Sequence, residues 1–76
     1  MNNSVLVVIY DKLGQFYSSP SGFVNDAVAI RWFNQMEKRG QGSDYELYKI
    51  GTYDCLLGVI TLLDNKEFLC RGDDNE

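Results

Sequence analysis

The chain has 76 residues, of which 45% are hydrophobic and 13% aromatic, so it can form one small domain and is not wholly disordered. Because only about 60% of the unfolded surface can be buried at this length, we expect marginal stability or self-association. The formal charge of −4 and the absence of histidine argue against a strongly basic duplex-DNA binder and against a histidine-based catalytic or metal site.

The first part of the chain predicts a β-hairpin. Residues 5–10 read Val-Leu-Val-Val-Ile-Tyr, a β-branched and aromatic run typical of a central strand. Asp11 begins a tight turn in which Gly14 is expected to take a positive φ. Residues 15–18 can return as a second strand, and we expect Pro20 to end it because proline cannot donate a hydrogen bond to a neighbouring strand.

The next segment predicts an amphipathic helix. Asn25 suits the N-cap, and Asp26 lies in the first turn, where a negative charge is favoured. No glycine or proline interrupts residues 26–39, and Gly40 is expected to end the helix. The apolar side chains that fall on one arc of this helix are Val28, Ala29, Ile30, Trp32, Phe33 and Met36. We expect this arc to pack on a sheet.

The second half of the chain predicts another hairpin after a loop at residues 40–44. Residues 45–53 have the composition of a strand, and Gly51 within them suggests a bulge. A turn at residues 54–58 would lead into a final strand at 59–63. The third strand divides its side chains between two faces, with Tyr45 and Leu47 on one and Tyr48 and Ile50 on the other.

The order strand, strand, helix, strand, strand predicts an α+β fold, a four-stranded antiparallel sheet with one amphipathic helix on one face (ββαββ). Residues 1–63 are expected to form this single domain, and residues 64–76, with five acids and two bases, an acidic and mobile C-terminal tail. Asp11 and Asp54 are expected to bond backbone amides at the turns rather than act as catalytic acids. The side chains expected to share one core are Val7, Ile9, Ile30, Phe33, Met36 and Ile60.

The aromatic side chains outnumber what one helix can cover. Those in the predicted strands are Tyr10, Phe16, Tyr17, Tyr48 and Tyr53. Such a surplus on a small domain predicts an exposed face that serves either as a dimer interface or as a stacking surface.

The two cysteines do not form a metal-binding pattern. Cys55 and Cys70 are fifteen positions apart and belong to no C-x-x-C pair, which argues against zinc. We expect two reduced thiols rather than a disulfide, because the Met-Asn-Asn-Ser start lacks the basic region of a secretory signal. No apolar run approaches the ~20 residues of a transmembrane helix, so we expect a cytosolic protein without a membrane partner.

Two motifs in this chain resemble a known viral family. Residues 25–33 read N-D-A-V-A-I-R-W-F, and residues 44–54 read D-Y-E-L-Y-K-I-G-T-Y-D. Together with the V-I-Y-D of residues 8–11 and with Phe16, they are similar in order and spacing to the small non-structural protein of gokushoviruses. These are microviruses, bacteriophages with circular single-stranded DNA genomes. The resemblance covers about residues 5–63; the family's usual D-D is Asp54-Cys55 here, so nothing is carried over to Cys55 or to the tail.

The resemblance implies a viral, non-structural protein that acts in DNA replication, in the cytoplasm of the bacterial host. The family is associated with viral DNA synthesis and has been described as DNA-binding, and it supplies no catalytic residues or cofactors to carry over. We therefore expect a non-enzymatic protein that binds single-stranded DNA as a small oligomer, through basic and aromatic side chains. The candidate binding residues are Lys12, Phe16, Tyr17, Arg31, Tyr48 and Lys49.

A second hypothesis remains open at this point. The near-neutral body and the surplus of aromatics also suit a dimeric protein-interaction module that redirects viral replication or packaging without contacting DNA. Its partners would be a second copy of the chain, the viral replication initiator, the procapsid or host replication proteins. Arg31 illustrates the ambiguity, because it suits a phosphate or a dimer contact as well as a salt bridge to a strand carboxylate.

Overall fold

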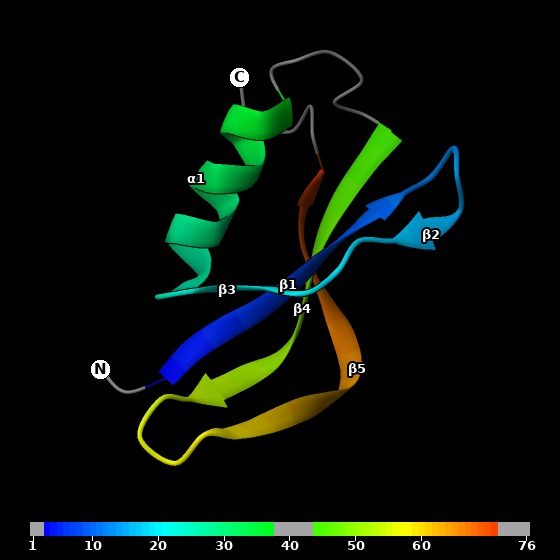
Figure 1. Cartoon of the computed structure of the whole chain (residues 1–76). Helices are drawn as coiled ribbons and strands as arrows, with labels where there is room; N and C mark the ends of the chain where they lie inside the picture. The colour runs from blue at the N-terminus through cyan, green and yellow to red at the C-terminus, as the bar shows by residue number, and fades with distance from the viewer. Residues whose placement is uncertain (1–2, 38–43, 72–76) are drawn as a thin grey trace.

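A curled antiparallel sheet with one helix on one of its faces forms the described part of the molecule (Figure 1). The computed structural model describes residues 3–37 and 44–71. Their elements are β1 (Asn3–Asp11), β2 (Phe16–Tyr17), β3 (Ser21–Phe23), α1 (Asp26–Glu37), β4 (Tyr45–Asp54) and β5 (Val59–Arg71). The strand order is β2-β1-β4-β5, and β3 also pairs with β1. The prediction of a small single domain with one helix on an antiparallel sheet is therefore confirmed, whereas the ββαββ order is matched only loosely.

The predicted second strand is divided into two short ones, β2 and β3, which both pair with β1. Pro20 lies between them, so it interrupts the pairing rather than ending it, and the prediction of a strand end at this residue is wrong. Ser18 bridges part of the gap. Its backbone N–H donates to the carbonyl oxygen of Ile9 at 2.8 Å, and its Oγ accepts from the Ile9 N–H at 2.9 Å. These two bonds keep the chain beside β1 up to the proline.

The last strand is longer than the sequence predicts. It was expected to end at Leu63, but β5 continues to Arg71 and pairs Phe68 with Tyr48 and Cys70 with Leu47. The expected boundary between domain and tail thus falls inside a strand, because pairing with β4 outweighs the low strand propensity of the polar residues 64–67. Residues 72–76 lie outside the described part of the chain.

Both hairpins close with the same turn. The side chain of an aspartate at the end of one strand accepts bonds from two backbone N–H groups, and its carbonyl oxygen accepts a third bond from the residue four positions on. The sets are Asp11 with Leu13, Gly14 and Gln15, and Asp54 with Leu56, Leu57 and Gly58. The expectation that both aspartates bond backbone amides is confirmed.

The residues of positive φ are the last ones of each turn. They are Gly58, at 70°, and Gln15, at 62°. The prediction that Gly14 takes the positive φ is therefore wrong. Gly14 is suited to its place for a different reason, since a Cβ there would collide with the ring of Phe16.

The helix begins as predicted. Asn25 caps it, with its Oδ1 accepting from the backbone N–H of Val28 at 2.9 Å. Ala29 and Phe33 are fully buried, and Ile30 and Trp32 pack beside them. The predicted end at Gly40, the loop that follows it and the side chain of Met36 lie outside the described residues.

The core lies between α1 and the sheet. Its buried members are Val7, Ile9, Ala29, Phe33, Leu47 and Cys70. Ile60 was expected among them, but it is 56% exposed, because the hairpin of β4 and β5 extends away from the helix (Figure 1). Cys70 fills the core from the part of β5 that the sequence did not predict.

A bulge at Ile50 confirms the irregularity predicted beside Gly51. Leu6 pairs with Gly51 and Val7 with Lys49, so Ile50 has no opposite residue in β1. β5 skips it too, and a longer irregularity there bends the strand. A Cβ at Gly51 would overlap the carbonyl oxygen of Thr61. Glycine is therefore required for β5 to approach β4 this closely.

Replacement of Phe33 by alanine should lower the free energy of unfolding by about 3–5 kcal/mol, because a fully buried aromatic ring is removed from the core. Chemical denaturation followed by circular dichroism measures the change. Arg31→Ala is the control, since Arg31 is exposed on the same helix and should change stability by less than about 0.5 kcal/mol. Equal effects of the two substitutions would contradict the assigned helix face.

Gly51→Ala and Gly22→Ala form a matched pair that tests the bulge. The first places a methyl group on the carbonyl oxygen of Thr61, whereas the second meets only ordinary contacts, the nearest at 3.7 Å to a methyl of Leu6. Gly51→Ala should destabilise by about 1–3 kcal/mol, the usual range for overpacking, and Gly22→Ala by clearly less. Thermal melts of both variants measure the difference, and similar melting temperatures would contradict the close approach.

Candidate functional site

Four aromatic rings line the face of the sheet opposite α1. Leu47 points from β4 into the core under the helix, so its neighbour Tyr48 points to the other side. The strand register places Phe68 beside Tyr48 and Tyr17 beside Tyr10. We refer to Tyr10, Tyr17, Tyr48 and Phe68 as the aromatic face.

The rings of the aromatic face form a continuous row from β2 to β5. The ring centroids of Tyr10 and Tyr17 are 4.6 Å apart, and those of Tyr17 and Tyr48 are 6.3 Å apart with the rings edge to face. Phe68 continues the row at 5.7 Å from Tyr48, again edge to face. These distances are favourable for aromatic pairs. Tyr17 and Phe68 each remain 46% exposed, so both ends of the row present ring surface to solvent.

A lysine from the last strand lies over this row. The Nζ of Lys66 is 5.5 Å from the ring centroid of Tyr17 and 5.2 Å from that of Tyr48, within the range of cation–π attraction. Tyr17 and Lys66 belong to β2 and β5, the two ends of the strand order, and the curl of the sheet brings them together. Among the described carboxylates, none forms an ion pair with Lys66. Its positive charge is thus held beside exposed aromatic surface without an acidic partner from the described residues.

Glu46 links the aromatic face to the first hairpin. The hydroxyl of Tyr48 donates to Glu46 Oε1 at 2.8 Å, and the Nζ of Lys12 lies 3.9 Å from Glu46 Oε2. The hydrogen bond to Glu46, followed by burial, raises the pKa of Tyr48 from 10.0 to about 12. Tyr48 therefore remains a protonated donor over the physiological pH range, and Lys12 lies at the margin of the aromatic face.

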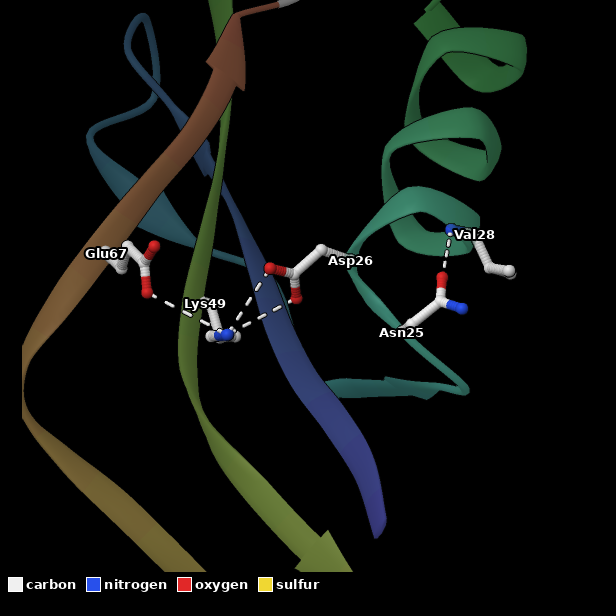
Figure 2. Close-up of polar contacts among 5 residues, drawn as sticks. All are labelled: Asn25, Asp26, Val28, Lys49 and Glu67. Carbon is white, nitrogen blue, oxygen red and sulfur yellow. Dashed lines mark hydrogen bonds and ion pairs between the residues drawn. The ribbon is translucent and has the colours of Figure 1, made fainter. Parts of the chain in front are cut away.

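Lys49 lies on the other face of the sheet, where it joins three elements. Its Nζ is 3.4 Å from both carboxylate oxygens of Asp26 in α1 and 3.8 Å from Glu67 Oε1 in β5 (Figure 2). The Lys49 side chain is mostly buried. This lysine holds the start of the helix against the sheet, and its charge is already compensated by two carboxylates.

The other predicted residues also divide between places. Tyr17 and Tyr48 meet in the aromatic face, whereas Arg31 is exposed on α1, on the far side of the sheet. No described carboxylate forms an ion pair with Arg31, so the salt bridge considered from the sequence is not seen there. Phe16 precedes Tyr17 and points to the opposite side of β2, where it is 59% exposed at the hairpin.

Three residues of this surface were missed from the sequence: Glu46, Lys66 and Phe68. Lys66 and Phe68 are two positions apart, the spacing of side chains on one face of a strand. That signal was available, but it was hidden because residues 64–76 were assigned to a tail. Glu46 has no local signal, since its role depends on the pairing of β4 with β1.

The remaining chemistry of the described residues is sparse. Cys55 is exposed at the second turn and Cys70 is buried in the core, and no disulfide joins them. Over residues 3–37 and 44–71, no three side chains of the types that bind metals gather in one place. No helix in the same ranges is long and apolar enough to cross a membrane.

The comparison with known families agrees with a viral origin. The family described as "Phage ORF5 protein" matches residues 4–75. The chain belongs to this family of phage proteins. No curated protein and no solved structure matches it. The family match includes the whole of β5, so the ORF5 family unit extends past the boundary expected at residue 63.

The bond between Tyr48 and Glu46 predicts a change of stability at alkaline pH. Because folding raises the pKa of Tyr48 from 10.0 to about 12, its contribution is complete below about pH 10 and is lost as the pH rises towards 12. Denaturation at several pH values and tyrosinate absorbance measure this loss. In Tyr48→Phe the corresponding part of the pH dependence should disappear, and in Glu46→Gln the late-titrating tyrosine should ionise earlier. An unchanged titration in Glu46→Gln would contradict the assignment.

Proposed function

We propose that this member of the phage ORF5 family is a non-enzymatic protein that binds single-stranded DNA through its aromatic face during synthesis of the viral genome. The motifs at residues 25–33 and 44–54 resemble those of gokushoviruses, which supports a role in a single-stranded DNA phage and a site of action in the host cytoplasm. The observation that carries the proposal is the row of rings with Lys66 above it.

The aromatic face has the two components that a single-strand binder needs. Proteins of this kind stack bases on aromatic rings and hold the backbone with nearby positive charges. Tyr17 and Phe68 offer half-exposed rings, and Lys66 lies close to the rings of Tyr17 and Tyr48. Lys12 adds a second cation at the margin, although Glu46 compensates it in part. Bases that are already unstacked can reach such rings, whereas those of a duplex cannot.

The charge distribution sets the expected strength of binding. With Lys66 and Lys12 as the cations of this face and a net charge of −4, few phosphates can be neutralised. The logarithm of the affinity for single strands falls by about 0.7 for each such contact per tenfold increase in salt. We therefore expect modest affinity with a shallow salt dependence, in contrast to the steep dependence of basic proteins.

Fluorescence polarisation with a labelled single-stranded oligonucleotide tests the proposal. Tyr17→Ala and Phe68→Ala should each weaken binding by about 1–3 kcal/mol, the usual contribution of one stacked base. Lys66→Gln should weaken binding and reduce the salt slope by about 0.7. A duplex of the same sequence should bind less tightly than the single strand.

Lys49→Gln and Arg31→Gln are the matched controls, because both remove one positive charge from the helix side of the molecule. They should leave the affinity and the salt slope nearly unchanged, whereas Lys49→Gln should lower stability. Equal losses with Lys66→Gln and the controls would indicate binding by net charge alone. Absence of binding by the wild-type protein at low salt would overturn the proposal.

A specific observation supports the alternative of a protein-interaction module. Leu56 and Leu57 at the second turn are the most exposed large apolar side chains after Leu13. Such a tip is suited to a contact with another protein, and the viral replication initiator or host replication proteins are the candidates for that role. In that case oligonucleotides of every kind would fail to bind, while substitutions at this tip would abolish replication in infected cells.

A further inference from the structure

One end of the sheet has a long apolar edge. β5 is last in the strand order, and no described strand pairs with its outer side. Residues 59–63 of this strand read Val-Ile-Thr-Leu-Leu, and all five are exposed. Leu62 is 67% and Ile60 56% exposed. The helix does not cover this region, because the hairpin of β4 and β5 projects beyond it (Figure 1).

This edge lacks the devices that normally keep edge strands apart. Soluble proteins protect such strands with charges, prolines, bulges or short length. The other edge of the sheet is formed by β2 and β3, with two and three residues and Pro20 close by. Residues 59–63 contain no charge and no proline, and the irregularity in the pairing of β5 comes only after Leu62. Their outward N–H and C=O groups are therefore available to another strand.

We propose that two copies of the chain associate by antiparallel pairing of residues 59–63 of β5, about a two-fold axis at Thr61. In this register Val59 faces Leu63 of the second copy, Ile60 faces Leu62, and Thr61 faces its own equivalent. The segment is thus self-complementary in size and polarity. The next acidic residue, Asp64, would stand opposite Gly58, so no like charges meet despite the acidic character of the chain.

A second copy suits this edge better than a different partner for reasons of symmetry and charge. Pairing about a two-fold axis uses the same edge in both copies and therefore closes after two. An uncharged edge offers nothing to a charged partner, but it avoids repulsion between two chains of equal charge. The apolar side chains that the pairing would cover or flank are Leu56, Leu57, Val59, Ile60, Leu62 and Leu63.

The size of the edge predicts a concentration-dependent dimer. These exposed side chains offer on the order of 500 Å² per copy, below the ~800 Å² per partner of a standard interface. Small interfaces of this kind associate weakly and reversibly. The shielding of this edge would also compensate for the limited burial possible in a chain of 76 residues.

The symmetry has a consequence that rests on the proposed DNA binding. Rotation about an axis normal to the sheet reverses the strand direction but keeps each face on its own side. Both helices would then cover one side of the dimer, and both aromatic faces would lie on the other. Since two linked sites bind a long ligand more tightly than either does alone, the dimer would favour oligonucleotides long enough to reach both faces.

Sedimentation of the full chain over a concentration series tests the pairing in the absence of DNA. The wild-type protein should shift from monomer to dimer as its concentration rises. Thr61→Lys and Thr61→Glu each place like charges opposite one another at the axis, so each should weaken dimerisation at least about tenfold. A mixture of the two variants should recover dimers, because the charges at the axis are then opposite. This recovery also shows that both variants fold.

Leu62→Lys and Leu13→Lys are matched substitutions of two highly exposed leucines, one on the proposed edge and one at the first turn. Leu62→Lys should weaken dimerisation, and Leu13→Lys should not. A wild-type protein that remains monomeric, equal effects of the two substitutions, or failure of the mixture to recover dimers would overturn the proposal. Growth beyond the dimer would exclude the closed two-fold pairing.

The DNA-dependent consequence is measured separately. Long oligonucleotides should bind more tightly to the wild-type protein than to Leu62→Lys, whereas short ones should bind equally to both. If neither protein binds DNA, the proposed function fails while the sedimentation result still decides the dimer. If both bind short DNA and the wild-type protein stays monomeric, the dimer fails alone.

Discussion

The burial of Phe33 against the sheet is the constraint on which the rest of the molecule depends. Phe33 of α1 and Leu47 of β4 are both fully buried in one core. Because side chains alternate along a strand, a shift of β4 by one residue would move Leu47 to solvent and Tyr48 into the core. The core therefore determines which rings form the aromatic face. It also brings Lys49 back to the helix side, where Asp26 and Glu67 compensate its charge.

β5 has two parts with different roles, and the bulge at Ile50 in β4 lies between them. The part after the bend adds Cys70 to the core and Lys66 and Phe68 to the aromatic face. The part before it lies beyond the helix and leaves its apolar side chains exposed. A chain this small has one helix and can cover only one region of its sheet. The stacking surface and the dimer edge that we propose both arise from the regions that this helix leaves uncovered.

The features that the sequence determined by itself are local. The cap at Asn25, the buried side of α1 and the aspartate-closed turns depend on residues within a few positions of one another, and their patterns were predicted before the sheet was known. Gly51 likewise indicated the bulge. The position of the positive φ was wrong at Gly14, because the turn places its left-handed residue one position later, at Gln15.

Only the tertiary structure decided the features that depend on pairing between distant segments. The polar residues 64–67 have low strand propensity, yet they continue β5 because β4 offers partners. The same pairing brings Lys66 over Tyr17, two residues that are far apart in the chain. Lys49 was predicted to bind phosphate, but the structure gives it two carboxylates. The sequence shows which side chains can stack or carry charge, whereas their partners follow from strand register, which is set by the burial of the whole core.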